Sequence, residues 1–296
     1  MNPVAFELFG YPIRWYGIII AGGVLVAFFI SYILAKKKGL DFDIITDGFL
    51  WSFPFAIIGA RLYYVAFEYK NYHSFIDVIN IRNGGMAIHG GLIGGLLTAY
   101  IFTKVKKINF FEYIDVIMPG IILAQAIGRW GNFMNQEAHG GPVTEQFISK
   151  FPQFIQNRML INGTYYHPTF LYESIWDLVV FLILIFILYK KKQQHGIIIG
   201  SYMVLYSLGR FFIEGLRTDS LMFFGLKTAQ IVSLIGIIIG TIIIFVAVKF
   251  QKNKNINAND EASYHLQITI SISHSIPCFC DYICIRFCHR DKSFKV

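Results

Sequence analysis

The sequence predicts an all-α, polytopic integral membrane protein with seven transmembrane helices. Of its 296 residues, 55% are hydrophobic and only 15% are charged, and the mean hydropathy is +0.53. A soluble chain of this length would need far more charge to cover its surface. Seven apolar stretches are each close to the roughly 20 residues that a helix needs to cross the hydrocarbon. They lie at about 16–35, 46–66, 84–104, 114–134, 168–189, 196–215 and 228–249.

Lysine clusters follow every second apolar stretch. They are Lys36–Lys38, Lys104/Lys106/Lys107, Lys190–Lys192 and Lys249/Lys252/Lys254. Because basic residues mark the cytoplasmic side, we expect the N-terminus outside and the C-terminus in the cytoplasm. The lysines follow the first stretch rather than precede it, so we expect a retained helix and not a cleaved signal peptide. The net charge of +8 reflects such topological clusters, and no nucleic-acid partner is expected.

Arginines interrupt three of the apolar stretches, at Arg61, Arg129 and Arg210. A charge within a span costs roughly 2.5–3.5 kcal/mol even on the gentlest insertion scale, so it usually faces a cavity and has a function. With the predicted orientation, all three fall in the outer half of the membrane. Tyr16 and His89 fall there as well. Intramembrane Arg–Glu pairs can also simply hold helices together, but three spans that converge at one depth favour a functional site.

Two stretches place several polar residues on one helical face. In the fourth stretch, Arg129 and Asn132 are one turn apart. In the sixth stretch, four residues are spaced by four, four and three, and these are Tyr206, Arg210, Glu214 and Arg217. Such spacings bring side chains to the same side of a helix. A glutamate between two arginines lowers the cost of burying them and can orient them toward a ligand.

The chemistry of arginine indicates the kind of ligand. Its planar, permanently charged guanidinium suits oxyanions, above all phosphate. At the outer half of a bilayer the abundant anion is the phosphodiester of a phospholipid head group, so the sequence predicts an anionic-lipid site. A transporter or flippase for such a lipid is the alternative, since buried charges also line transport pathways. Against it, the halves show no clear internal repeat and the polar residues cluster at one depth.

Two further segments could contribute to the site. His89 lies in GGMAIHGGLIGG and is the obvious candidate if a proton must move, although a structural role is the alternative. HPTFLYE, with His167 and Glu173, is less specific, and its proline reads as a helix start. The connection 135–167 is too long for a simple turn, and we expect a small outer lobe or a lid there.

Five ordered segments resemble one known family. IRWYGI, HGGLIGG, GRWGNFMNQEAHG, HPTFLYE and GRFFIEGLRTD are similar to the motifs of the prolipoprotein diacylglyceryl transferases, in that family's order and within residues 1 to about 250. The resemblance implies a multi-pass enzyme of the bacterial inner (cytoplasmic) membrane. Such an enzyme moves the diacylglyceryl group of phosphatidylglycerol to the thiol of the lipobox cysteine of a prolipoprotein. A thioether and glycerol phosphate are the products, and no cofactor is implied.

The resemblance also implies roles for individual residues. Arg129 and Arg210 would be catalytic, gripping the phosphate and stabilising charge as the glycerol–phosphate bond breaks. His89 is one candidate for assisting deprotonation of the thiol. On the family's motif positions, the expected substrate-binding residues are Arg129, Tyr16, Asn132, Glu137, Gly140, Glu214 and Arg217. Tyr206 and Arg61 join this set because of their positions in the spans, not because of the resemblance. No metal cluster is evident, and residues 1–250 contain no cysteine, which excludes a cysteine-linked intermediate in the membrane body.

The end of the chain departs from the family. We expect a membrane catalytic domain over residues 1–254 and an atypical cytoplasmic tail over 255–296. All four cysteines lie in this tail, at positions 278, 280, 284 and 288. A cytoplasmic location disfavours disulfides, and the paired C-x2-C spacing of common zinc sites is missing. An interfacial or disordered appendage is therefore the expectation.

Overall fold

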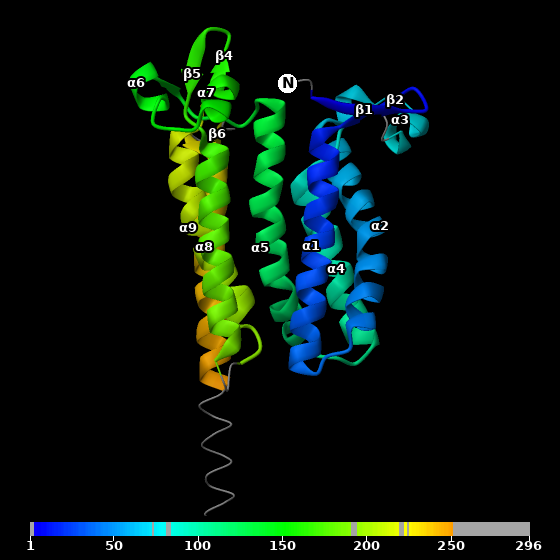
Figure 1. The fold of residues 1–296 in the computed structure, drawn as a ribbon. Coiled ribbons are helices and arrows are strands. Elements are labelled where there is room, and N and C mark those ends of the chain that lie inside the picture. Colours follow the sequence, from blue (N-terminus) through cyan, green and yellow to red (C-terminus); the bar gives the residue numbers. More distant parts are fainter. Residues whose placement is uncertain are drawn as a thin grey trace, which may run out of the picture. The chain divides into compact units, whose positions relative to one another are not determined.

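A computed structural model describes residues 3–72, 74–80, 84–190, 194–218, 222–223 and 225–250. The predicted tail at 255–296 lies outside these residues. Within the described part, seven helices are long and apolar enough to cross a membrane, which confirms the predicted class (Figure 1). They are α1 (Trp15–Lys38), α2 (Phe42–Phe67), α4 (Ile88–Val105), α5 (Phe110–Asn135), α8 (Thr169–Tyr189), α9 (Ile197–Leu216) and a last helix, Thr228–Phe250.

The ends of these helices differ from the predicted spans for local reasons. The side chain of Asp41 caps α2 by accepting from Asp43 N–H at 2.9 Å, and Asn109 caps α5 in the same way. These caps start both helices about a turn before the apolar stretch. The third span begins at Ile88 rather than at 84, because Gly84 and Gly85 have φ values of 80° and 78°, which no α-helix can contain.

Small residues bring the first four spanning helices together in two close pairs. In the α1–α5 pair, a Cβ on Gly120 would lie 2.6 Å from the carbonyl oxygen of Ala27. In the α2–α4 pair, a Cβ on Gly59 would lie 2.5 Å from the carbonyl oxygen of Gly90. Such contacts allow the two backbones to touch, as is common between helices in membranes. Among α1, α2, α4, α5, α8 and α9, these two pairs have the most extensive interfaces.

The helices α8 and α9 pack beside α5. The indole of Trp176 in α8 covers Gly209 of α9, where a Cβ would lie 2.1 Å from the ring. Its Nε1 donates to Leu205 O at 2.9 Å. Gly200 of α9 and Gly240 of the last helix also lie against each other, since a Cβ on Gly240 would lie 2.7 Å from the carbonyl oxygen of Gly200. The position before Arg210 is therefore fixed by packing on α8.

The connection between α5 and α8 is a small folded lobe. It consists of β3 (Pro142–Val143), α6 (Glu145–Ile148), α7 (Gln153–Met159), β4 (Leu160–Ile161) and β5 (Thr164–Tyr166). The strands form an antiparallel sheet in the order β3-β5-β4. Buried residues of the lobe pack on the adjoining helix ends, and this core is Phe133, Ile148, Ile155, Met159 and Phe170. The connection 135–167 thus shares a hydrophobic core with the ends of α5 and α8.

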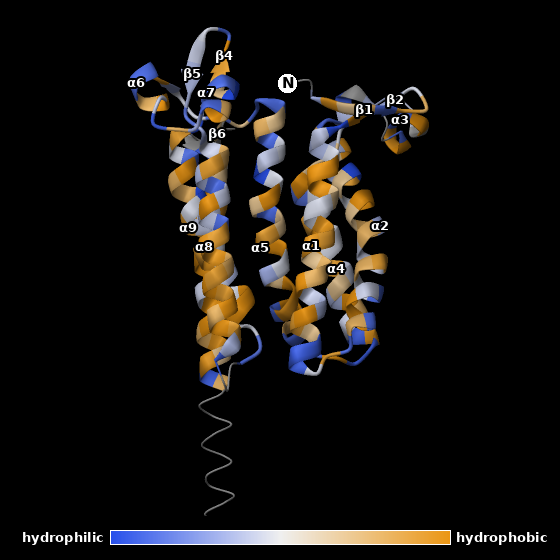
Figure 2. Cartoon of the chain, viewed as in Figure 1, coloured by the Kyte–Doolittle hydropathy of each residue, from blue (hydrophilic) through white to orange (hydrophobic). Residues whose placement is uncertain are grey.

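The short elements gather at one end of the bundle (Figure 1). Besides the lobe, this end carries β1 (Val4–Leu8), β2 (Tyr11–Arg14), η1 (Tyr69–Asn71), α3 (Phe75–Ile79), β6 (Met222–Phe223) and β7 (Leu226–Lys227). We call it the lobe end. The described members of the lysine clusters lie at the opposite end, which we call the lysine end, and these are Lys36, Lys37, Lys38, Lys104, Lys106, Lys107, Lys190 and Lys249. Between them the helices are predominantly hydrophobic (Figure 2).

Candidate active site

Charged side chains of three helices meet toward the lobe end of the bundle. Arg129 of α5 places Nη1 2.8 Å from Glu173 Oε2 of α8. Its Nη2 donates to the hydroxyl of Tyr206 in α9 at 3.3 Å. The side chain of Glu173 is only 5% exposed and that of Arg129 19%. The arginine that interrupts the fourth span is therefore paired, as a buried charge must be.

Glu173 also holds the second predicted catalytic arginine. Arg210 Nη1 lies 2.8 Å from Glu173 Oε1, and Arg210 Nη2 lies 2.6 Å from Glu214 Oε2. Arg217 approaches both carboxylates, at 3.7 Å from Glu173 and 4.0 Å from Glu214. Three arginines thus surround two carboxylates, and the Arg210–Glu214–Arg217 face predicted from spacing is present. We call Arg129, Glu173, Arg210, Glu214 and Arg217 the arginine cluster.

Asp177 lies one turn deeper in α8, below Glu173. It is 2% exposed, and its Oδ2 has no hydrogen-bond partner among the described residues. From the sequence, Glu173 was only a less specific candidate, and Asp177 was not among the predicted residues. The available signal was their spacing of four, which places two carboxylates on one face of a helix in a protein whose apolar stretches also contain arginines.

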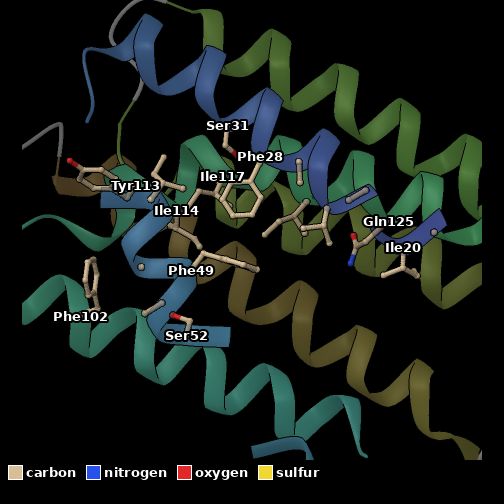
Figure 3. A pocket seen from close by; sticks show the side chains of 18 of the residues that line it. Ile20, Phe28, Ser31, Phe49, Ser52, Phe102, Tyr113, Ile114, Ile117 and Gln125 are labelled. Atoms are coloured by element: carbon tan, nitrogen blue, oxygen red, sulfur yellow. The ribbon is translucent and has the colours of Figure 1, made fainter. Parts of the chain in front are cut away.

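A cavity of about 560 Å³ opens beside Arg129. Its polar rim consists of Tyr16, Arg129 and Asn132, with Gln125 a little deeper, and the rest is mostly apolar. The ring of Tyr16 lies on Gly131, where a Cβ would come within 2.8 Å of it. Figure 3 shows the cavity from Gln125 and Ile20 toward Tyr113 and Phe102. The cavity therefore brings three of the predicted residues together, and Arg129 belongs to both the cavity and the arginine cluster.

Glu137 and Gly140 lie where the lobe leaves α5. Glu137 Oε1 accepts from Asn132 Nδ2 at 3.0 Å and from Asn135 Nδ2 at 3.3 Å. Gly140 forms a backbone bridge with Arg217 and donates to His167 O at 3.0 Å. A Cβ on Gly140 would lie 2.6 Å from the Cβ of His167. Both residues thus join the lobe to the helices that carry the arginine cluster.

Arg61 is placed differently from the expectation. It is 7% exposed, and all its nitrogen atoms donate to backbone carbonyls of the segment before α4, at 2.7–3.0 Å. The acceptors are Asp77, Val78, Asn80, Gly84 and Gly85. These bonds use all five N–H donors of a guanidinium. The structure therefore gives Arg61 a role in ordering this segment, and it does not bring Arg61 into the arginine cluster.

His89 is also separate from the arginine cluster. It is the second residue of α4 and is exposed, and its ring centroid lies 6.1 Å from that of Tyr63 in α2. Among the described residues, it makes no hydrogen bond or ion pair to Arg129 or Arg210. It shares only the lobe end with them, so its expected catalytic role stays a prediction.

Comparisons with known proteins show the family of this chain. The family model described as prolipoprotein diacylglyceryl transferase matches residues 3–246. A protein of Clostridium perfringens (strain 13 / Type A), named phosphatidylglycerol–prolipoprotein diacylglyceryl transferase 1, is 63% identical over 255 residues, covering 86% of this chain and 97% of its own. Relatives with that name, without the number, are 58% identical in Clostridium kluyveri (81% and 94% covered) and 54% identical in Clostridium botulinum strain Langeland (85% and 99% covered). The chain belongs to the prolipoprotein diacylglyceryl transferase family.

Proposed function

We propose that this protein transfers the diacylglyceryl group of phosphatidylglycerol to the thiol of the lipobox cysteine of a prolipoprotein, the first step of lipoprotein maturation. One observation carries the proposal: Arg129 lines a long apolar cavity and also belongs to a buried arginine cluster. A phospholipid has the matching pair of parts, a phosphate and long apolar chains. The names of the relatives supply the particular lipid and the protein acceptor.

The arginines act on the leaving group. The thiolate sulfur attacks the glyceryl carbon, the bond between this carbon and the phosphate oxygen breaks, and its electron pair leaves with glycerol phosphate. The phosphate gains negative charge in this step, so guanidinium groups stabilise the transition state more than the bound lipid. Glu173 holds Arg129 and Arg210 at 2.8 Å each. Both side chains are therefore ordered before the lipid binds, which lowers the entropic cost of binding.

The remaining predicted residues have supporting roles in this proposal. Tyr16 and Asn132, at the rim of the cavity, bind the head group with Arg129. Tyr206, Glu214 and Arg217 keep Arg129 and Arg210 in place, and Glu137 and Gly140 fix the lobe beside them. The thiolate is the reactive form of the cysteine. His89 is the candidate that accepts the thiol proton, since it is exposed at the same end of the bundle.

We propose that the lysine end faces the cytoplasm, because basic residues are retained on that side of a bacterial inner membrane. The N-terminus is then outside, and the arginine cluster lies in the outer half of the bilayer. This orientation places the reaction where the lipobox of an exported prolipoprotein arrives.

The purified protein tests the function directly. It is incubated in vesicles of phosphatidylglycerol with a lipobox peptide, and the mass of the peptide is measured. We expect an increment of one diacylglyceryl group, and none on a matched peptide with serine in place of cysteine. No increment on the cysteine peptide, or an equal increment on the serine peptide, would contradict the proposal.

A further inference from the structure

The cavity extends much deeper than a head group requires. Its lining residues on α5 run from Phe110 to Asn132, a rise of about 33 Å at roughly 1.5 Å per residue. From Arg129 down to Tyr113 the rise is about 24 Å by the same measure. The chains of one bilayer leaflet span only about 15 Å, half of a hydrocarbon core of roughly 30 Å. The space below Arg129 is therefore long enough for an entire acyl chain.

The cavity changes character along this length. Near the lobe end, only α1 and α5 supply lining residues. Toward the lysine end, α2 contributes residues between Ile44 and Ser52 and α4 contributes residues between Ala99 and Thr103. Four helices therefore surround the deep half. We call this part the closed half and define it by six of its lining residues: Phe28, Gly48, Phe49, Phe102, Ile114 and Ile117.

Aromatic rings and one glycine shape the closed half. Phe28 of α1 and Phe49 of α2 meet edge to face, with centroids 4.8 Å apart (Figure 3). Phe102 of α4 lies farther toward the lysine end. Gly48 faces Phe102, and a Cβ there would lie 3.5 Å from its ring. An alanine would fit at position 48, but a larger side chain would have to occupy the cavity itself.

We propose that the closed half receives the end of one acyl chain and selects lipids by chain length. This inference rests on the proposed function and deepens it by assigning a part of the lipid to a part of the cavity. Because the chain moves from the hydrocarbon of the bilayer to an apolar cavity, there is no hydrophobic gain, and selection depends on how well the chain packs against the cavity wall. A chain that fills the closed half is bound best, and a side chain that occupies this space excludes the ends of long chains.

The test replaces Gly48 with leucine. Wild type and Gly48→Leu are given a lipobox peptide with an equimolar mixture of didecanoyl, dimyristoyl and distearoyl phosphatidylglycerol. The mass of the modified peptide then shows which lipid was used. The matched control is Gly22→Leu in α1, because a Cβ on Gly22 would meet nothing within 4 Å among the described atoms. A second variant, Phe102→Ala, enlarges the closed half instead of filling it.

We expect Gly48→Leu to lower the ratio of stearoyl to decanoyl products by roughly tenfold, the lower end of the discrimination that one misfitted methylene gives in an apolar pocket. Gly22→Leu should leave the ratio as in wild type, and Phe102→Ala should raise the share of stearoyl product. If Gly48→Leu slows all three lipids equally and Phe102→Ala leaves the ratio unchanged, the closed half does not select chain length. Absence of any transfer by wild type would instead refute the proposed function.

Discussion

Glu173 of α8 lies 2.8 Å from Arg129 of α5 and links the two spanning helices that the lobe joins. The same carboxylate lies 2.8 Å from Arg210, so one side chain neutralises part of the charge of both predicted catalytic residues. Removing one partner of a buried ion pair leaves an uncompensated charge, which is strongly destabilising. The arginine cluster therefore depends on Glu173 more than on any single arginine.

Glu173→Gln should lower both the thermal stability and the rate of transfer. The substitution keeps the shape but removes the charge that Arg129 and Arg210 share, at a cost of roughly 3–5 kcal/mol for a buried pair. Unfolding in detergent and initial transfer rates are the measurements. Glu145→Gln, on the exposed face of the lobe, is the control and should behave as wild type. Unchanged stability and rate in Glu173→Gln would show that the pairing has no role.

Gly140→Ala should reduce activity while Gly141→Ala does not. At position 140 a Cβ would lie 2.6 Å from His167 Cβ and 3.0 Å from Leu216 O, whereas at position 141 the nearest atom is 3.8 Å away. Overpacking of this kind costs about 1–3 kcal/mol and would move the end of α9 next to Arg217. Transfer rates of the two variants decide the question. Equal rates would contradict the close approach at position 140.

Arg61→Lys should destabilise the protein without abolishing transfer. An ammonium has only three donors, so at least two of the carbonyls that Arg61 now binds would lose their partner, at a cost of roughly 1–3 kcal/mol for each buried group. Thermal unfolding should therefore begin at a lower temperature, while the folded fraction keeps its transfer rate. Loss of transfer at unchanged stability would return Arg61 to the substrate-binding set.

The stability of the protein should fall in mild acid because His167 takes up a proton more readily in the unfolded chain. Burial lowers the pKa of His167 from its ordinary value of 6.5, so the unfolded chain takes up the proton first. His167 therefore makes its full contribution to the free energy of unfolding above pH 6.5. This contribution decreases as the pH falls from 6.5 toward the lowered pKa of the folded protein. Thermal unfolding of wild type and His167→Gln at about pH 7.5 and about pH 5.5 measures this term. The variant should lose less stability than wild type over that interval, and an identical loss in both proteins would contradict it.

The seven spans could be predicted because length and apolar composition suffice to identify a membrane helix. The convergence of polar residues at one end also followed from the sequence, since alternating helices reverse direction. Pairing between different helices could not be predicted in this way. Arg61 and Arg129 look alike in the sequence, yet one binds backbone carbonyls and the other binds Glu173. The difference lies in neighbours from other helices.

The cavity could not be predicted from the sequence either. It exists because the pairs α1–α5 and α2–α4 pack closely within themselves and less extensively against each other. Glycines such as Gly59 and Gly120 indicate close packing, but they do not reveal the partner helix. For the same reason Glu173 was only a less specific candidate and Asp177 was not predicted, since only the fold shows that their face of α8 meets the arginines.

The most direct measurement of the central claim compares wild type with Arg129→Gln. Both products are followed in one assay: the mass increment on the lipobox peptide and the glycerol phosphate released from phosphatidylglycerol. Loss of one donor to a developing charge typically lowers the rate by about 10²–10³, so both products should fall together by that order. Lys150→Gln, an exposed change in the lobe, should leave both unchanged. Wild-type rates in a folded Arg129→Gln protein would contradict the assignment of the arginine cluster as the phosphate site.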